Sequence, residues 1–183
     1  MALPPPALRR RTLLQRAAAV VLGAPAAARA QAGPATNTLV PWRPARPPRL
    51  EATDLQTEQR RTLADFAGQA LIVNFWATWC APCRVELPSL NAAVDRLAPR
   101  GLRLLAVNHG EMPERARRFL NEVPIHGTVL LDRSLSQLRA WGASGLPASF
   151  VLDAKGRPRH MAFGEIDWLA APVLAVLESA VAA

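Results

Sequence analysis

Short apolar runs alternate along the chain with longer stretches that have helical periodicity, and this order predicts an α/β fold. Apolar runs between turn residues are typical of buried strands, whereas apolar positions spaced three or four apart indicate helices. Strands are expected at 50–55, 61–63, 71–76, 102–107, 128–131, 148–152 and 159–163. Helices are expected at 82–97, 113–122, 134–141 and 167–180. The order predicts a mixed central sheet flanked by helices.

The first thirty residues have the pattern of an export signal peptide. Arg9-Arg10-Arg11 form a charged segment, Ala17–Ala28 is apolar, and Ala28-Arg29-Ala30 fits a cleavage site between small residues. The apolar segment is shorter than the roughly 20 residues that a membrane span needs. We therefore expect residues 1–30 to be a signal, with the paired arginines favouring the twin-arginine type over an ordinary one. An uncleaved membrane anchor is the alternative.

A proline-rich segment follows at residues 31–49, with prolines at 34, 41, 44, 47 and 48. Proline removes a backbone donor and favours extended structure, so we expect a linker that lacks regular structure and packs little. The folded domain is then expected at residues 50–183. Whether the signal is cleaved or kept as an anchor, the domain is expected to face an extracytoplasmic, oxidising compartment, which predicts a periplasmic protein.

The net charge of +8 reflects mainly the N-terminal segment. Five of the 22 basic residues lie in the first thirty positions, where there is no acid, so 17 basic residues remain against 14 acidic ones. After this segment no run of arginines is longer than a pair, and there is no nucleic-acid motif. The charge therefore gives no reason to expect nucleic acid as a partner.

The two cysteines of the chain, Cys80 and Cys83, lie where a predicted strand meets a predicted helix. At a helix N-terminus, unpaired N–H groups and the helix dipole favour a thiolate on Cys80, and the thiolate is the species that attacks a disulfide. Cys83 lies one turn later on the same face and can resolve the mixed disulfide. A zinc site would want further ligands, and a purely structural disulfide would close only a short loop. These two alternatives stay open.

Two segments carry a resemblance to a known family. Val73–Pro88, with its Trp-Cys-Ala-Pro-Cys core, resembles the active-site segment of the thioredoxin superfamily, and is most similar to exported reductases of the TlpA and ResA type. Residues 145–153 resemble the second signature of that group. The resemblance covers the chain from Leu50 onwards. It implies a thioredoxin-like fold, and it implies that Pro147 is a cis-proline which, with Leu146, binds extended substrate backbone.

Further candidate residues surround the cysteines. Glu86 matches an acidic residue of the ResA-type reductases and shares a helix face with Cys83; it either exchanges protons with the dithiol or is a solvated first-turn glutamate. Asn74 stands where many thioredoxins have a buried aspartate. Trp79 either offers a docking surface or packs in the core. His109 follows a buried strand at an edge where α/β sites gather.

These observations predict a thiol–disulfide oxidoreductase that works as a reductase. The resemblance implies client proteins with disulfides as partners, from cytochrome c or copper-site maturation, and a membrane electron-donor protein. No cofactor is expected. The alternative is a copper-binding assembly factor in which Cys80 and Cys83 are soft ligands and His109 is the third. A peroxidase is disfavoured because its nucleophile normally follows a threonine by three positions, whereas Thr78 precedes Cys80 by two.

Overall fold

The computed structural model describes Met1 and residues 38–183, so the expected signal peptide lies outside the described residues. Eight strands of the described part form one mixed sheet in the order β1-β8-β7-β4-β5-β6-β2-β3. The strands are β1 (Val40–Pro41), β2 (Glu51–Asp54), β3 (Arg60–Thr62), β4 (Ala70–Trp76), β5 (Leu102–His109), β6 (Thr128–Asp132), β7 (Ala148–Leu152) and β8 (Pro158–Phe163). The helices are α1 (Ala81–Leu97), α2 (Pro113–Glu122), α3 (Gln137–Ala140) and α4 (Ala171–Val181), with short 3₁₀ turns at Leu63–Phe66 and Ala98–Arg100.

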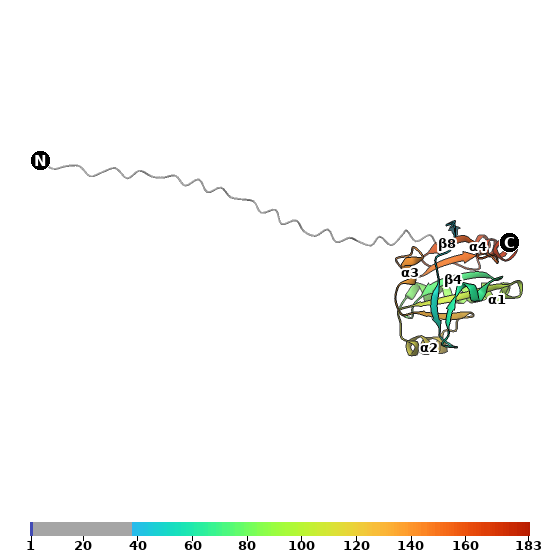
Figure 1. Ribbon diagram of the computed structural model, residues 1–183, viewed down its shortest axis with the longest axis horizontal. Helices are drawn as coiled ribbons and strands as arrows, with labels where there is room; N and C mark the ends of the chain where they lie inside the picture. The colour runs from blue at the N-terminus through green and yellow to red at the C-terminus, as the bar shows by residue number, and fades with distance from the viewer. Residues whose placement is uncertain (2–37) are drawn as a thin grey trace.

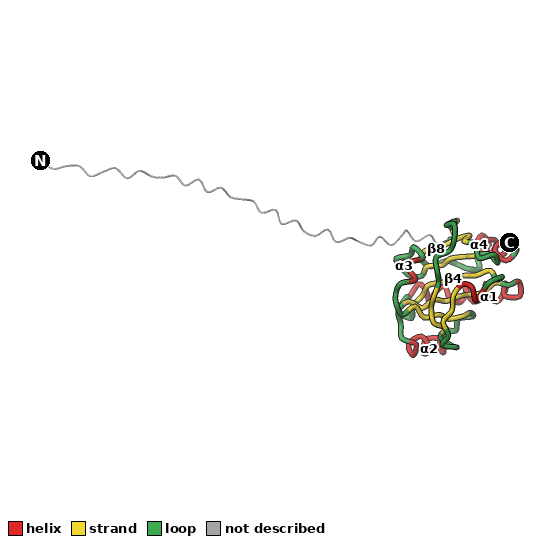
Figure 2. Tube along the Cα trace, in the orientation of Figure 1, coloured by secondary structure: helices red, strands yellow, loops and turns green. Residues whose placement is uncertain are grey.

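The centre of the sheet is parallel and its flanks are antiparallel. Strands β4, β5 and β6 pair in parallel and are joined by α1 and α2, whereas β7, β8 and β2 join antiparallel. All seven residues of β4 are buried, because strands pair with both its edges and helices cover the sheet. Figures 1 and 2 show the strands in the middle of the molecule, with β8 and α4 at one end and α2 at the other.

Side chains of β4 point alternately to two apolar cores. Ile72 and Trp76 pack on one face with α1 and α4, and both are fully buried. Leu71, Val73 and Phe75 pack on the other face, where α3 and the aromatic ring of Trp141 cover the sheet. Since successive residues of a strand face opposite sides, an uninterrupted apolar run is what a strand covered on both faces requires.

The fold class is confirmed, and the predicted elements appear with shifted ends. The main difference lies in the proline-rich segment. Its last part packs on the domain: Leu39 is buried, Val40–Pro41 pair with β8, and Trp42 stacks on Trp141 with ring centroids 5.8 Å apart. The expectation of a segment that packs little is wrong for these residues. Proline is compatible with this packing, because an edge strand needs its backbone N–H donors along one side only.

The helix expected at 134–141 is also shorter than predicted. It spans Gln137–Ala140, with Ser136 as its N-cap residue. The buried carboxylate of Asp132 accepts hydrogen bonds from the Ser134 hydroxyl at 2.6 Å and from the Gln137 N–H at 2.8 Å. Ser and Asp side chains that bond the local backbone favour turns over helix, which explains the delayed start.

Candidate active site

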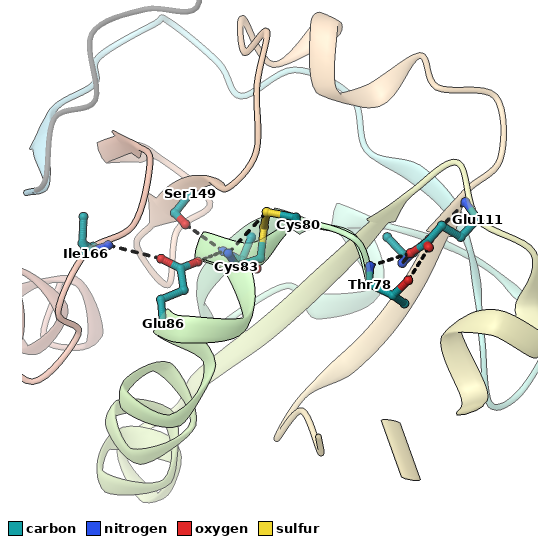
Figure 3. The surroundings of a disulfide bond; sticks show 9 residues. Thr78, Cys80, Cys83, Glu86, Glu111, Ser149 and Ile166 are labelled. Carbon is teal, nitrogen blue, oxygen red and sulfur yellow. Dashed lines mark hydrogen bonds between the residues drawn. A yellow bond between two sulfur atoms is a disulfide. The ribbon is translucent and has the colours of Figure 1, made fainter. Parts of the chain in front are cut away.

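The cysteines lie at the junction of β4 and α1, as the sequence predicted. They are joined in a disulfide, with Cα atoms 5.3 Å apart (Figure 3). Cys80 is the N-cap of α1, and its sulfur accepts the Cys83 N–H at 3.3 Å. Cys80 is 4% exposed and Cys83 1%, so Cys80 is the more accessible residue of the pair. This arrangement suits Cys80 as the attacking atom and Cys83 as the resolving one.

Glu86 lies inside the molecule and not on the helix surface. Its side chain is 2% exposed and shares the buried face of α1 with Cys83. One oxygen accepts the Asn74 amide N–H at 2.8 Å, and the other faces the Ile166 N–H at 3.3 Å. Of the two sequence interpretations, the solvated glutamate is therefore wrong.

Burial dominates the titration of Glu86. Loss of solvation raises the pKa of this carboxyl from 4.5 to about 7, although the hydrogen bonds from Asn74 and Ile166 oppose the rise. The negative charge of Glu165 raises the pKa further. A group with a pKa near neutrality can give or take a proton at working pH, which is the property that general acid–base chemistry needs.

Asn74 connects Glu86 to the neighbouring strand. Its amide also donates to the Ser149 hydroxyl at 2.9 Å, and Asn74 and Ser149 are opposite each other in the β4–β7 pair. The amide places a neutral donor, and not a second carboxylate, beside Glu86. A second acid there would make it harder still to ionise Glu86.

The Leu146–Pro147 peptide bond is cis, as the family resemblance implied. The β4–β7 register pairs Phe75 with Ala148, so Pro147 lies level with the end of β4, near the start of the cysteine loop. Leu146 packs against the core cluster that contains both cysteines. Trp79 is 60% exposed, so it is not a core residue. The role of Pro147, Leu146 and Trp79 in substrate binding stays a prediction.

Glu111 is a second buried carboxylate at the site, and the sequence reasoning missed it. It is 8% exposed and accepts the Thr78 N–H at 2.7 Å, the Thr78 hydroxyl at 2.6 Å and the Asn108 amide at 2.7 Å. The Arg115 Nε lies 2.8 Å from it. Figure 3 shows Glu111 and Thr78 on one side of the disulfide and Glu86 on the other. Glu111 thereby holds the loop that leads into Cys80. Glu111 lies 31 positions after Cys80 in the chain, so no local pattern in the sequence connected it with the cysteines.

His109 does not complete a metal site. It ends β5 opposite Asp132. Within residues 38–183, no three side chains of His, Cys, Asp or Glu gather in a way that could hold a metal ion. The copper-binding alternative therefore lacks its third protein ligand in the described part of the chain.

Comparison with known proteins agrees with this geometry. Residues 45–161 match the AhpC/TSA family. The chain belongs to the AhpC/TSA family. It is 32% identical over 117 residues to the thiol-disulfide oxidoreductase ResA of Geobacillus thermodenitrificans, covering 64% of this chain and 67% of that one. It is 31% identical over 99 residues to ResA of Bacillus subtilis, covering 54% and 55%.

Solved structures show the same fold. A crystal structure described as a thiol:disulfide interchange protein DsbE from Chlorobium tepidum superposes with a TM-score of 0.68 at 26% identity, covering 74% of this chain and 95% of that one. A second thioredoxin-family protein from Chlorobium tepidum TLS gives 0.64 at 27% identity, covering 76% and 98%. With its cysteine pair at the helix start, this AhpC/TSA member is a thiol–disulfide oxidoreductase with a thioredoxin-like fold.

Proposed function

We propose that this oxidoreductase works as a reductase of disulfides in exported client proteins. The observation that carries the proposal is the buried Glu86 on the helix face of Cys83. A strong oxidant needs a stabilised thiolate in its reduced form. A buried carboxylate beside the dithiol opposes thiolate formation, and Ala81 and Pro82 between the cysteines offer no charge that stabilises it.

The chemistry follows from the positions of the two sulfurs. The Cys80 thiolate attacks a client disulfide and forms a mixed disulfide, while one client sulfur leaves as a thiolate. Cys83 then attacks the Cys80 sulfur, which releases the second client thiol and closes the disulfide seen here. We assign to Glu86, with its pKa of about 7, the role of taking the proton from Cys83 as this thiol becomes the nucleophile.

The setting is part of the proposal. The N-terminal signal pattern supports export to the periplasm, where disulfides are stable and a reductase needs a supply of electrons. We propose a membrane protein as that donor. As clients we propose proteins with disulfides at the cysteines of cytochrome c or of copper sites. No helix within residues 38–183 is long and apolar enough to cross a bilayer.

The reduction potential of the Cys80–Cys83 couple tests the proposal. Equilibration with dithiothreitol buffers and alkylation of the free thiols should give a value below about −200 mV, on the side of thioredoxin. A value near that of strong oxidants, about −120 mV, would refute the reductase direction.

Two variants test the roles of the sulfurs. Cys80→Ser should abolish disulfide reduction, and Cys83→Ser should accumulate mixed disulfides with clients, visible on non-reducing gels. If Cys80→Ser trapped the clients instead, the two roles would be exchanged. Metal analysis of the reduced protein and an assay of hydrogen peroxide consumption examine the copper and peroxidase alternatives.

A further inference from the structure

Three large apolar side chains are exposed on the α2 side of the disulfide. Trp79 is 60% exposed, Met112 53% and Leu135 49%, whereas most large apolar residues of the domain are buried. They come from loops that follow β4, β5 and β6, and the carboxyl ends of these parallel strands meet at one edge of the sheet. We call Trp79, Met112, Leu135 and the neighbouring Arg133 the α2-side surface.

Contacts connect the members of this surface to one another and to the active-site loop. Glu111, next to Met112, binds the backbone N–H and hydroxyl of Thr78, next to Trp79. The Arg133 guanidinium lies 3.2 Å from the Met112 sulfur. Leu135 lies directly on Gly110, where an added Cβ would overlap its side chain. The loops that carry these four residues are therefore held together, beside the loop that carries Cys80.

The backbone of Leu135 is in a costly conformation. Its φ is +60°, in the left-handed region that disfavours residues with a Cβ other than Asn and Asp. Residues held in such a region carry backbone strain and gather at binding sites. The Leu135 side chain is largely in solvent, so its burial does not offset the backbone strain. Binding of an apolar group at this surface gives the exposed leucine a physical reason.

The charge around the disulfide differs between its two sides. The α2 side carries exposed guanidinium groups: Arg133, Arg115, which is 58% exposed, and Arg84, which lies over the Phe119 ring. The carboxylates of Asp132 and Glu111 on this side are buried and hydrogen-bonded, and the exposed acids of α2 itself are Glu114, in its first turn, and Glu122, at its other end. On the side of Glu86, the charges nearby are the exposed carboxylates of Glu165 and Asp167, which flank Ile166 in the chain.

We propose that the α2-side surface docks the part of a client polypeptide that carries acidic and apolar side chains beside its disulfide cysteine. The inference rests on the proposed reductase function and adds which clients it prefers. Trp79, Met112 and Leu135 contact the apolar groups, and the guanidinium groups attract the acidic ones. An acidic segment on the opposite side would face Glu165 and be repelled, so the surface also orients the client across the two sulfurs.

Synthetic peptides closed by one internal disulfide test the inference. Two peptides share their sequence, apart from a run of Glu or of Lys beside the first cysteine, and a second pair carries the run beside the last cysteine. The protein is reduced beforehand and freed of reductant. Each turnover moves two electrons and two protons from the Cys80–Cys83 dithiol to the peptide disulfide, and the peptide thiols formed are counted over time.

We expect the better of the two Glu peptides to be reduced about two- to fivefold faster than its Lys counterpart, with the ratio falling as salt is added. Arg133→Gln should lower the ratio, whereas Arg100→Gln, an exposed change before the amino end of β5, should leave it unchanged. Equal rates for Glu and Lys peptides, or a ratio that Arg133→Gln does not change, would overturn the inference. Failure to reduce any peptide would instead count against the reductase function itself.

Leu135→Asn separates docking from stability. Asn tolerates the left-handed backbone, so the variant should unfold at a urea concentration no lower than the unmodified protein. It also removes the apolar contact, so it should reduce both peptides about two- to fivefold more slowly. Unchanged rates in this folded variant would remove Leu135 from the docking surface and overturn that part of the inference.

Discussion

The buried carboxyl of Glu86 should make the stability of the oxidised protein depend on pH. The folded state holds this proton with a pKa of about 7, whereas the ordinary value is 4.5. A carboxyl with a raised folded pKa contributes stability that is fully present below about pH 4.5 and is lost as the pH rises through 7. The rise corresponds to about 3 kcal/mol, of which roughly 2.5 kcal/mol should disappear between pH 5 and pH 8.

Other groups in the chain act differently in this window. The lowered pKa values of Asp54, Asp65 and Asp153 place their titration at lower pH. His160 has a pKa lowered mainly by burial, so its contribution rises with pH, opposite in sign to that of Glu86. A comparison of two variants cancels these terms, because both variants retain them.

Glu86→Gln is the variant to compare. Glutamine has one acceptor oxygen, so either the Asn74 amide or the Ile166 N–H loses its partner, at a cost of about 1–3 kcal/mol at every pH. That cost moves the whole stability curve, but the fall of roughly 2.5 kcal/mol between pH 5 and pH 8 should vanish.

Urea unfolding of the oxidised protein, followed by tryptophan fluorescence from pH 5 to pH 8, measures both effects. Glu122→Gln makes the same chemical change on the exposed face of α2 and should leave the pH dependence intact. If the curves of the unmodified protein and Glu86→Gln ran parallel, Glu86 would not titrate in this window, and its proposed part in proton transfer would fail.

Three further predictions follow from contacts at the site and at the N-terminal strand. In reduced Glu86→Gln, alkylation of the thiols should shift to lower pH, because a nearby negative charge is gone; a curve superimposable on that of the unmodified protein would contradict this. Glu111→Gln should lower the free energy of unfolding by about 2–4 kcal/mol in urea at pH 7, since it breaks the buried bonds to Thr78 and leaves a donor unpaired. Trp42→Ala should lower the free energy of unfolding by about 1–3 kcal/mol in the same assay, because the ring packs on Trp141 and Phe150. An unchanged midpoint would mean that this segment is only a linker and does not stabilise the domain.

Much of the fold could be predicted from local pattern. Strand β4 is an apolar run that only a strand covered on both faces accommodates, and α1 begins with a proline at its first turn, where the missing N–H has no partner. The cysteine pair at this junction specified the chemistry, since both the spacing and the helix terminus act locally. The cis state of Pro147 came from the family resemblance and not from the residues around it.

The remaining features depend on residues far apart in the chain. Trp42 meets Trp141 only after β1 has paired with β8, and no pattern within the proline-rich segment reports that partner. The sequence also could not decide whether Trp79 is exposed, because an aromatic residue beside an apolar strand fits either a core or a surface.

The sequence by itself therefore determined the order of strands and helices, the α/β class and the pair of sulfurs, because periodicity, turn chemistry and helix capping act over a few residues. Only the tertiary structure decided the state of the two glutamates. Glu86 is buried because α1, β4, β7 and the loop before α4 enclose it, and Glu111 meets Thr78 across the edge of the sheet. The ionisation of a carboxyl depends on the solvent and charges around it in space, and the chain fixes those surroundings only when it folds.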